Sequence, residues 1–314
     1  MTANCPICLG VASGTAIRVR SGKQMTLYQC PTCKFDFFNV DPTELLAANK
    51  LDESRLQSAG LDIPTLERDF ANGIRQSLPY IGEYVDASDR GRNVLEMGCS
   101  WGYFLQLLQQ NGVRPHGVEL NAIRARYVND QLAIPCFASL EECEARKITF
   151  KKIFLFYVLE YIPDPPAYLK RLMQLLDDDG QIVLVTPNLA DPLKDIWSNQ
   201  AFRKFFYDEC AVNYFTPNAL RALVAGLAAH ESRVTTKQGY SVVNHLSWFL
   251  TNGPRTTGMV GGDYYVADIA RTLRAGQAAL GCVLADKIEE FDTQYRKLIE
   301  REDCGNQIHC VISR

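Results

Sequence analysis

Residues Asn93 to Glu119 decide the fold, and they read NVLEMGCSWGYFLQLLQQNGVRPHGVE. A short apolar run ends in Glu96, a turn bracketed by Gly98 and Gly102 follows, and apolar residues then recur at helical spacing. A second short run ends in Glu119, twenty-three residues after Glu96. The stretch therefore predicts a strand, a tight glycine turn, a helix and a second strand, which is the βαβ unit of mononucleotide-binding sheets.

The ends of these two strands predict where a nucleoside would bind. Glycine at positions 98 and 102 lets the backbone approach a ligand that a Cβ would push away. Glu119 stands at the tip of the second strand, where an acidic side chain can hold ribose hydroxyls. The alternative is a βαβ unit whose glycines only ease the packing of helix on sheet.

The glycine spacing resembles one known family. It is not G-x-G-x-x-G; with Glu96 two residues before Gly98, it resembles motif I of class I S-adenosylmethionine (SAM) methyltransferases, with Ser100 replacing the middle glycine. The resemblance implies an α/β, Rossmann-like sheet and SAM as cofactor, with Glu96 supporting the methionine end and Glu119 binding the ribose. The remaining cofactor-binding positions that it implies are Gly98, Cys99, Ser100, Trp101, Gly102, Tyr103, Phe104, Leu120, Ser139, Leu140 and Tyr157.

Composition limits the class of protein. The 314 residues fit one large domain with an appendage, or two domains, and an apolar content of 47% is ample for a core. The net charge of −3, without a dominant basic run, argues against general nucleic-acid binding. No signal peptide or membrane-length apolar run is visible, so we expect no membrane partner and a cytoplasmic location. Eleven cysteines then indicate a metal site rather than disulfides.

Four of the cysteines form two identical turns. Cys5-Pro-Ile-Cys8 and Cys30-Pro-Thr-Cys33 are separated by twenty-one residues, which contain two predicted strands around the turn at 21–23. Two such pairs can present four thiolates tetrahedrally, so the sequence predicts a closed, structural zinc site. So small a segment buries little core, and the metal would supply its folding energy. The alternative is four unrelated buried cysteines.

Two further segments resemble parts of known enzymes. The run CPTCKFDFFN, which begins at Cys30, closely resembles the zinc-binding head of many methyltransferases encoded with glycan and deoxysugar pathways. The run from Asn244 to Trp248 resembles a tail segment of the same enzymes. We predict a zinc ribbon at 1–41, a helical lid or linker at 42–89, and a SAM-binding domain at 90–314. A helical insertion at about 240–303 precedes the last strand, which we expect to pair antiparallel at the sheet edge; residues 264–300 could form a homo-oligomer contact.

The predicted fourth strand departs from the family pattern. Residues 153–165, IFLFYVLEYIPDP, resemble the segment H-V-L-E-H-V-x-D-P, with Tyr157 and Tyr161 replacing both histidines. Lys151-Lys152 replaces the acidic residue that often precedes this strand, and Ala211 replaces a third histidine. A phenol titrates near pH ~10, so Tyr157 would need a strongly lowered pKa to act as a general base. We prefer a role for both tyrosines in lining the acceptor pocket.

Proton abstraction from an acceptor needs a base, and the chain has only four histidines. His245, between Asn244 and Trp248, is the predicted general base, with a core histidine as its equal alternative. Glu160, at the end of the fourth strand, is the second candidate, although it could only buttress the loop.

These features predict a zinc-ribbon-headed SAM methyltransferase that acts on a small molecule. A hydroxyl of a sugar, nucleotide-sugar or related glycan precursor is the predicted acceptor, and this choice depends on the resemblance of the head and tail segments. The alternatives are C- or N-methylation of a natural-product intermediate, an RNA methyltransferase with a zinc head, and a SAM-binding protein that has lost catalysis.

Overall fold

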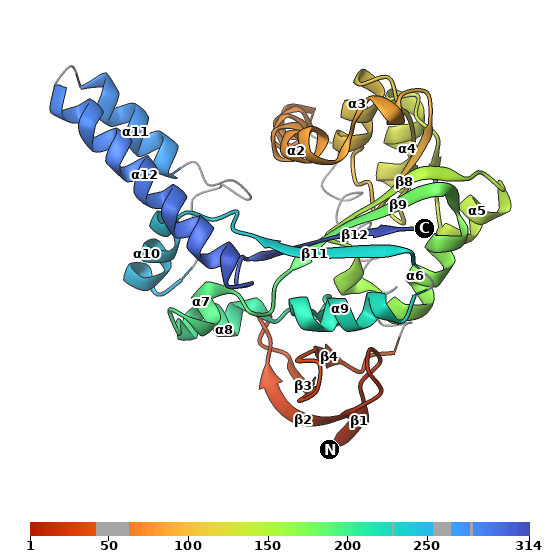
Figure 1. Ribbon diagram of the computed structural model, residues 1–314, viewed down its shortest axis with the longest axis horizontal. Coiled ribbons are helices and arrows are strands. Elements are labelled where there is room, and N and C mark those ends of the chain that lie inside the picture. Colours follow the sequence, from red (N-terminus) through yellow and green to blue (C-terminus); the bar gives the residue numbers. More distant parts are fainter. Residues whose placement is uncertain (42–62, 228, 254–264, 277–278) are drawn as a thin grey trace. The chain divides into compact units, whose positions relative to one another are not determined.

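The computed structural model describes two compact units of the chain (Figure 1). The described residues are 1–41, 63–227, 229–253, 265–276 and 279–314. The first unit comprises Met1–Phe38, Thr186–Arg221 and Val234–His309, and the second comprises Asn39–Val185, Ala222–Arg233 and Cys310–Arg314. Residues 42–62 of the predicted lid and 254–264 of the predicted insertion lie outside the described residues. The domain boundaries therefore stay predictions.

A seven-stranded sheet forms the core of the fold, in the order β11-β12-β9-β8-β5-β6-β7. The adjacent pairs within β9-β8-β5-β6-β7 are parallel. This parallel, doubly wound arrangement confirms the predicted Rossmann-like α/β class. The strands are β5 (Asn93–Met97), β6 (Arg114–Val118), β7 (Cys136–Phe137), β8 (Phe150–Phe156), β9 (Leu176–Pro187), β11 (Glu231–Lys237) and β12 (Gln307–Ser313).

Helices pack on the parallel part of the sheet within the second unit. Figure 1 shows α2, α3 and α4 grouped on one side of strands β8 and β9, with α6 on the other side. The apolar side chains of α3 recur at helical spacing, so Leu105 and Leu108 are fully buried with Val128 of α4 and Phe154 of β8. The elements are α2 (Ile63–Tyr84), the 3₁₀ turn η1 (Ala87–Asp89), α3 (Tyr103–Gln110), α4 (Ala122–Gln131), α5 (Leu140–Ala145), the 3₁₀ turn η2 (Leu159–Tyr161) and α6 (Pro165–Gln174).

Lys152, which departs from the family pattern, anchors α2 to the sheet. Its ammonium lies 2.7 Å from Asp89 Oδ2 and donates to the Tyr84 carbonyl at 2.7 Å, at the last residue of α2. Both charged side chains are buried. Removing one partner of such a pair leaves an uncompensated buried charge and typically costs about 3–5 kcal/mol. The ion pair therefore fixes the end of α2 against β8.

The sheet differs in one respect from the sequence prediction, and its longest strand carries an acidic run. Strand β9 begins at Leu176, so the aspartates of 177–180 belong to the strand. The aspartates are held in place because Asp177 pairs with Arg92 at 2.8 Å and Asp179 pairs with Lys151 at 2.7 Å. The prediction that the last strand lies at the sheet edge is wrong, because β12 lies between β9 and β11.

The orientation of the last strand agrees with the prediction. The amide of Arg314 donates to the Gly180 carbonyl at 3.0 Å, and the amide of Asn188 donates to the Asn306 carbonyl at 3.0 Å. Since the contacts run in opposite directions along the two segments, β12 is antiparallel to β9.

The first unit contains a five-stranded antiparallel sheet, in the order β1-β2-β3-β4-β10. The predicted turn at 21–23 is present, with Gly22 at φ 88°. The fifth strand was not predicted: Tyr214 of β10 pairs with Asp36 of β4, 178 positions earlier in the chain by their numbering. The strands are β1 (Thr2–Asn4), β2 (Val11–Arg18), β3 (Gln24–Gln29), β4 (Asp36–Phe38) and β10 (Asn213–Tyr214).

The helices of the first unit include the predicted C-terminal helical run. This run is two helices, α11 (Tyr265–Ala275) and α12 (Ala279–Arg301), which lie side by side (Figure 1). Helix α12 exposes Leu280, Phe291 and Leu298, and an oligomer contact there stays a prediction. The other helices are α7 (Pro192–Asp195), α8 (Gln200–Phe206), α9 (Pro217–Ala225, whose last residues belong to the second unit) and α10 (Val242–Thr251).

None of the helices in the described part of the chain is long and apolar enough to cross a membrane.

The four N-terminal cysteines converge as the sequence predicts. Their sulfur atoms all lie within 4.8 Å of one another, with Cys5 Sγ 3.6 Å from Cys33 Sγ and Cys8 Sγ 3.5 Å from Cys30 Sγ. Tetrahedral zinc with Zn–S bonds of about 2.3 Å requires sulfurs about 3.8 Å apart, so the cluster fits that ion.

The two cysteine turns also have the same backbone. Leu9 and Lys34, each directly after the second cysteine of its turn, both have φ 61°. Their amides donate to the carbonyls of Cys5 and Cys30, at 2.9 and 3.0 Å. Each turn therefore presents its pair of thiols in the same way, as a closed four-thiolate site needs.

We predict that the purified protein contains one zinc ion per chain and that Cys5→Ser lowers both the zinc content and the thermal stability. Three thiolates bind zinc more weakly, and the small N-terminal sheet depends on the metal for stability. Elemental analysis and thermal unfolding measure the two effects. Cys282→Ser, at an exposed thiol of α12, is the matched control. A metal-free protein in which Cys5→Ser is harmless would contradict the zinc site.

Candidate functional site

The loop after β5 has an unusual backbone. Gly98, Ser100 and Gly102 have φ values of 67°, 51° and 81°, in the left-handed region. A Cβ on Gly98 would lie 2.8 Å from Val158 Cγ2, and one on Gly102 would lie 2.7 Å from Leu132 Cδ1. Ser100 is the one non-glycine residue of these three, and it holds the left-handed conformation at a cost in backbone strain.

Glu119 connects the ends of β5 and β6. Its Oε2 accepts a hydrogen bond from the Ser100 amide at 2.9 Å, and its Oε1 accepts one from the Asn121 amide at 2.8 Å. Asn121 in turn caps α4, because its side-chain oxygen accepts from the amides of Ile123 and Arg124. A carboxylate has about four lone-pair sites, so Glu119 holds the loop and can still accept hydroxyl donors.

Glu96 lies at the end of β5 and lacks a complete set of partners. It is 7% exposed, and its Oε2 makes no hydrogen bond to any residue that the structure describes. Burial, and then the negative charge of Glu119, raise the pKa of Glu96 well above its ordinary value. A buried, unsatisfied carboxyl oxygen beside a second carboxylate fits a cationic donor such as an ammonium group.

Aromatic side chains enclose the start of α3. Phe70 of α2 lies against Tyr103, with ring centroids 5.1 Å apart, and Trp101 lies against Tyr127 at 5.3 Å. Gly73 makes the close approach of α2 possible, because a Cβ there would lie 2.3 Å from the Tyr103 ring. Helix α2 therefore covers the first turn of α3, next to the glycine loop.

Other predicted cofactor-binding residues have different environments. Cys99 and Phe104 are each 2% exposed and belong to the core, where they support the loop. The Ser139 hydroxyl caps α5 by accepting from the Glu142 amide at 3.2 Å, and Leu140 is buried behind it. Leu120 is 54% exposed, so its side chain is accessible to a ligand.

The tip of β8 brings the two predicted acceptor-side tyrosines to the surface. Tyr157 has φ 57° and is 38% exposed, whereas Tyr161 is 47% exposed. Tyr157 is hydrogen-bonded to Tyr80 of α2, which stacks on Phe156 at 4.4 Å. The carboxyl ends of parallel strands share one edge of the sheet, and the contact between Val158 and Gly98 places this tip beside the glycine loop. Glu160 is nearby in sequence but 5% exposed.

His245 belongs to the first unit and is fully buried. Its Nδ1 lies 2.5 Å from the Tyr295 hydroxyl, and its Nε2 lies 3.3 Å from the Gln238 side-chain nitrogen. Burial lowers the pKa of His245 to about 4. Both ring nitrogens have partners within the core, so these contacts favour the structural alternative for His245, and its role as a base stays a prediction.

Sequence reasoning missed two contributors to this region. Asn121 follows a strand and precedes a helix, so the usual N-cap signal could have identified it. Val158 contacts Gly98, but no local sequence pattern predicts a contact between residues sixty positions apart.

Known relatives cover part of the chain. The ubiquinone biosynthesis O-methyltransferase of Idiomarina loihiensis is 26% identical over 157 residues, which span 48% of this chain and 62% of that protein. The ubiquinone biosynthesis O-methyltransferase of Neisseria meningitidis serogroup C is 25% identical over 160 residues, which span 48% and 64%. The chain therefore spans less than two thirds of the length of these relatives.

Solved structures with a similar arrangement also exist. A SAM-dependent methyltransferase from Archaeoglobus fulgidus has a TM-score of 0.48 and 15% identity, over 81% of this chain and 100% of that chain. Coclaurine N-methyltransferase bound to N-methylheliamine and S-adenosylhomocysteine has a TM-score of 0.44 and 13% identity, over 77% of this chain and 72% of that chain.

The family match is more extensive. Residues 67–227, slightly more than half of the 314 residues, match the methyltransferase domain family. This range contains the glycine loop, Glu96, Glu119 and the tip of β8. The chain therefore belongs to the methyltransferase domain family.

Proposed function

We propose that this protein transfers a methyl group from SAM to a hydroxyl of a small, saccharide-like acceptor, such as a sugar, a nucleotide-sugar or a related precursor. The observation that carries the cofactor assignment is the buried, unpartnered Oε2 of Glu96 beside the Glu119 carboxylate. SAM carries an ammonium group and ribose hydroxyls, the two kinds of donor that these carboxyl groups lack.

The residues of the glycine loop would hold the two ends of SAM. Glu96 would accept from the ammonium of the methionine part, and Glu119 would accept from the ribose hydroxyls while keeping its bonds to the loop amides. A Cβ at either glycine would collide with a neighbouring side chain, so glycine at both positions keeps the loop in the conformation that presents these acids. When bound, SAM would supply a methyl group that its own sulfonium activates.

The remaining task of the protein is to position the acceptor and remove one proton. Tyr157 and Tyr161 are exposed at the tip of β8, where they would orient the acceptor hydroxyl. The hydrogen bond between Tyr157 and Tyr80 fixes the phenol of Tyr157, so less side-chain entropy is lost when the acceptor binds. We propose Glu160 as the first proton acceptor to test, because His245 is enclosed by core partners.

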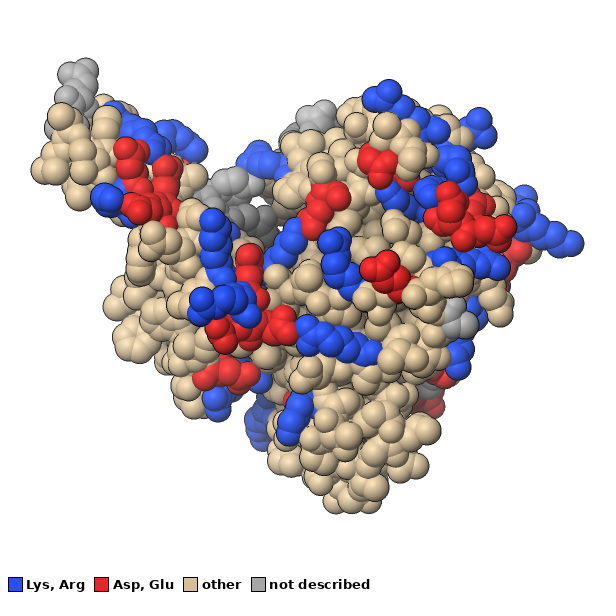
Figure 2. Space-filling model, viewed as in Figure 1, with Lys and Arg blue, Asp and Glu red and all other residues tan. Residues whose placement is uncertain are grey.

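Three features support a small acceptor with a reacting oxygen. The head and tail segments resemble glycan-pathway enzymes, and the relatives named above are O-methyltransferases. On the face shown in Figure 2, acidic and basic side chains are intermixed and no broad basic surface for RNA appears there. Several basic side chains are also paired with acids, as Arg171 is with Glu144 and Arg92 with Asp177. Methyl transfer to carbon, nitrogen or RNA, and SAM binding without turnover, are the outcomes that an acceptor screen would distinguish.

We predict that Glu119→Ala weakens SAM and S-adenosylhomocysteine binding by about 100-fold, since hydrogen bonds to charged groups contribute about 1.5–3 kcal/mol each. Calorimetry on the wild type and the variant measures the change. Asp130→Ala, at an exposed carboxylate of α4, controls for loss of negative charge on the same βα unit. A folded wild type that binds neither compound would refute the cofactor assignment.

We predict that SAM affinity rises with pH and that binding releases a proton. The raised pKa of free Glu96 favours its neutral form, whereas a bound ammonium would lower that pKa. Between the two pKa values binding therefore expels the proton, and the affinity levels off once the pH exceeds the pKa of the free protein. Calorimetry in buffers of different ionisation enthalpy counts the protons. Glu96→Gln should abolish the effect, and proton uptake by the wild type would contradict it.

We predict that Tyr157→Phe lowers kcat/KM for the acceptor by about tenfold, the loss expected for one hydrogen bond, with unchanged SAM affinity. His245→Gln should instead lower the melting temperature and preserve kcat, because it disturbs the contacts with Tyr295 and Gln238. Initial rates and thermal unfolding separate these effects. A stable His245→Gln protein that binds SAM normally but has no turnover would restore His245 as the base.

A further inference from the structure

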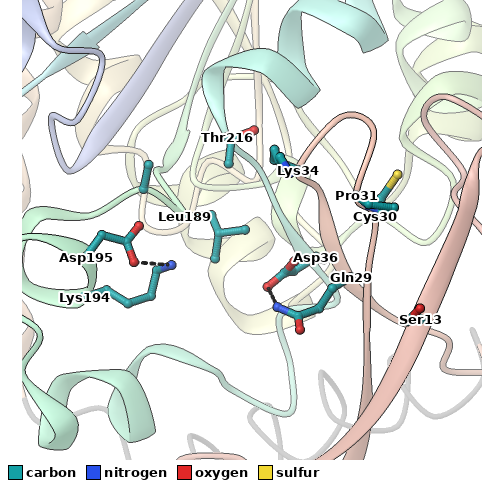
Figure 3. Close-up of a pocket in the computed structure, with 11 residues that line it drawn as sticks. Ser13, Gln29, Cys30, Pro31, Lys34, Asp36, Leu189, Lys194, Asp195 and Thr216 are labelled. Atoms are coloured by element: carbon teal, nitrogen blue, oxygen red, sulfur yellow. Dashed lines mark hydrogen bonds and ion pairs between the residues drawn. The ribbon is translucent and has the colours of Figure 1, made fainter.

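A cavity of about 560 Å³ lies within the first unit, apart from the residues of the glycine loop. One wall comes from the N-terminal sheet and includes Ser13, Gln29 and Asp36. The other wall comes from the segment after β9 and includes Leu189 and Asp195 (Figure 3). Its volume falls within the range of about 300–1,000 Å³ that is typical of small-molecule sites.

The walls of this cavity are fixed to each other. Phe37 of β4 pairs with Asn213 of β10, and the Thr216 hydroxyl donates to the Cys33 carbonyl at 3.2 Å. The rings of Phe35 and Phe215 pack together behind them, with centroids 4.9 Å apart. The cavity is therefore formed before any ligand arrives.

Asp36 gives the cavity a buried polar group that is held in position. It is 5% exposed, and its Oδ2 accepts hydrogen bonds from the Tyr207 hydroxyl at 2.7 Å and from the Gln29 amide at 3.1 Å. Figure 3 shows Asp36 and Gln29 joined on one side of the cavity. A carboxylate has about four lone-pair sites, so this fixed carboxyl group can still accept a hydrogen bond from a hydroxyl donor.

The charges that line the cavity are balanced. Lys194 Nζ lies 2.9 Å from Asp195 Oδ1, a pair drawn in Figure 3, and Lys34 stands with Asp36 among the other lining residues. Two ammonium groups thus accompany two carboxylates, and the lining contains no arginine. A phosphate would be repelled by the carboxylates of the lining, and a cationic ligand would be repelled by its ammonium groups. The lining therefore favours a neutral ligand.

The lining also alternates hydrogen-bonding and apolar groups. Carboxylate oxygens and the Gln29 carbonyl accept hydrogen bonds, whereas the lysine ammonium groups donate them, and the Ser13 hydroxyl can do both. Leu189 and Pro31 add an apolar surface. Each hydroxyl of a sugar ring is both donor and acceptor, and its C–H faces are apolar, so such a ring matches this combination.

We propose that this cavity binds a neutral, polyhydroxylated ligand of about the size of a hexose ring. The inference extends the proposed function, because it identifies a separate saccharide-binding site on a protein whose acceptor we propose to be saccharide-like. The site is assigned to the first unit only, and SAM binding in the second unit can be measured independently of it.

The test is saturation-transfer NMR with the methyl α- and β-glycosides of glucose, galactose and mannose, on zinc-loaded full-length protein without SAM. At least one glycoside should bind in the millimolar range. Asp195→Asn removes a carboxylate from the lining, and Ser13→Tyr places a ring in the cavity; each should weaken binding about tenfold or more. Zinc content and thermal unfolding show whether the variants are folded.

Matched controls use the same substitutions at exposed positions outside the lining. Asp178→Asn repeats the change of charge, and Thr15→Tyr repeats the added ring two residues along β2, on the face that Ser13 also occupies. Both should bind the glycosides as the wild type does. Equal weakening in the controls would overturn the assignment of the site.

Three other results would also overturn the inference: no glycoside binds, both lining variants bind normally, or inorganic phosphate binds and competes. Asp195→Asn distinguishes phosphate from a glycoside. It removes the partner of Lys194, so it would strengthen phosphate binding and weaken glycoside binding. Calorimetry with SAM on the same samples separates the two proposals. SAM binding without glycoside binding refutes the cavity assignment alone, whereas glycoside binding without SAM binding refutes the proposed function alone.

Discussion

The carboxylate of Glu119 is the contact on which the cofactor site depends. It accepts one amide from the loop after β5 and one from the residue that caps α4, so a single side chain fixes the ends of two neighbouring strands. The loop needs this support because Ser100 occupies a backbone region that costs a non-glycine residue energy. Glu119 thus both supports the loop and can accept from a ligand. Its position at the end of the second strand therefore predicts the ligand site from the sequence.

A second constraint acts from the opposite side of the loop. The buried pair of Lys152 and Asp89 fixes the end of α2 against β8, and Gly73 lets the same helix approach Tyr103 closely. Helix α2 also supplies Tyr80, which is bonded to Tyr157 at the tip of β8. One helix therefore connects the glycine loop to the residues proposed to meet the acceptor. A lysine in place of the family's acid makes this possible, because only a cation could neutralise Asp89 in the core.

The sequence predicts features that residue type and short spacing encode together. The positive φ values of Gly98 and Gly102, the acid at the end of β6 and the two equivalent cysteine turns are of this kind. It could not predict features that depend on contacts between distant segments. Asp89 and Lys152 are 63 positions apart, and strand β10 joins a sheet formed by the first forty residues. His245 illustrates the same limit: its neighbours in sequence suggested a pocket, whereas Tyr295, 50 positions later, encloses it in the core.

Charge balance distinguishes the glycine loop from the cavity of the first unit. At the glycine loop, Glu96 and Glu119 bring two carboxyl groups together, and the described hydrogen bonds to Glu119 come from backbone amides, so that site favours a ligand with positive charge. In the first unit, the carboxylates of Asp36 and Asp195 are accompanied by Lys34 and Lys194, so that site has no net charge to offer. A methyl donor is cationic and a sugar is neutral. The acidic glycine loop therefore suits the cationic methyl donor, and the charge-balanced cavity suits a neutral saccharide. Binding of each ligand can be measured without the other.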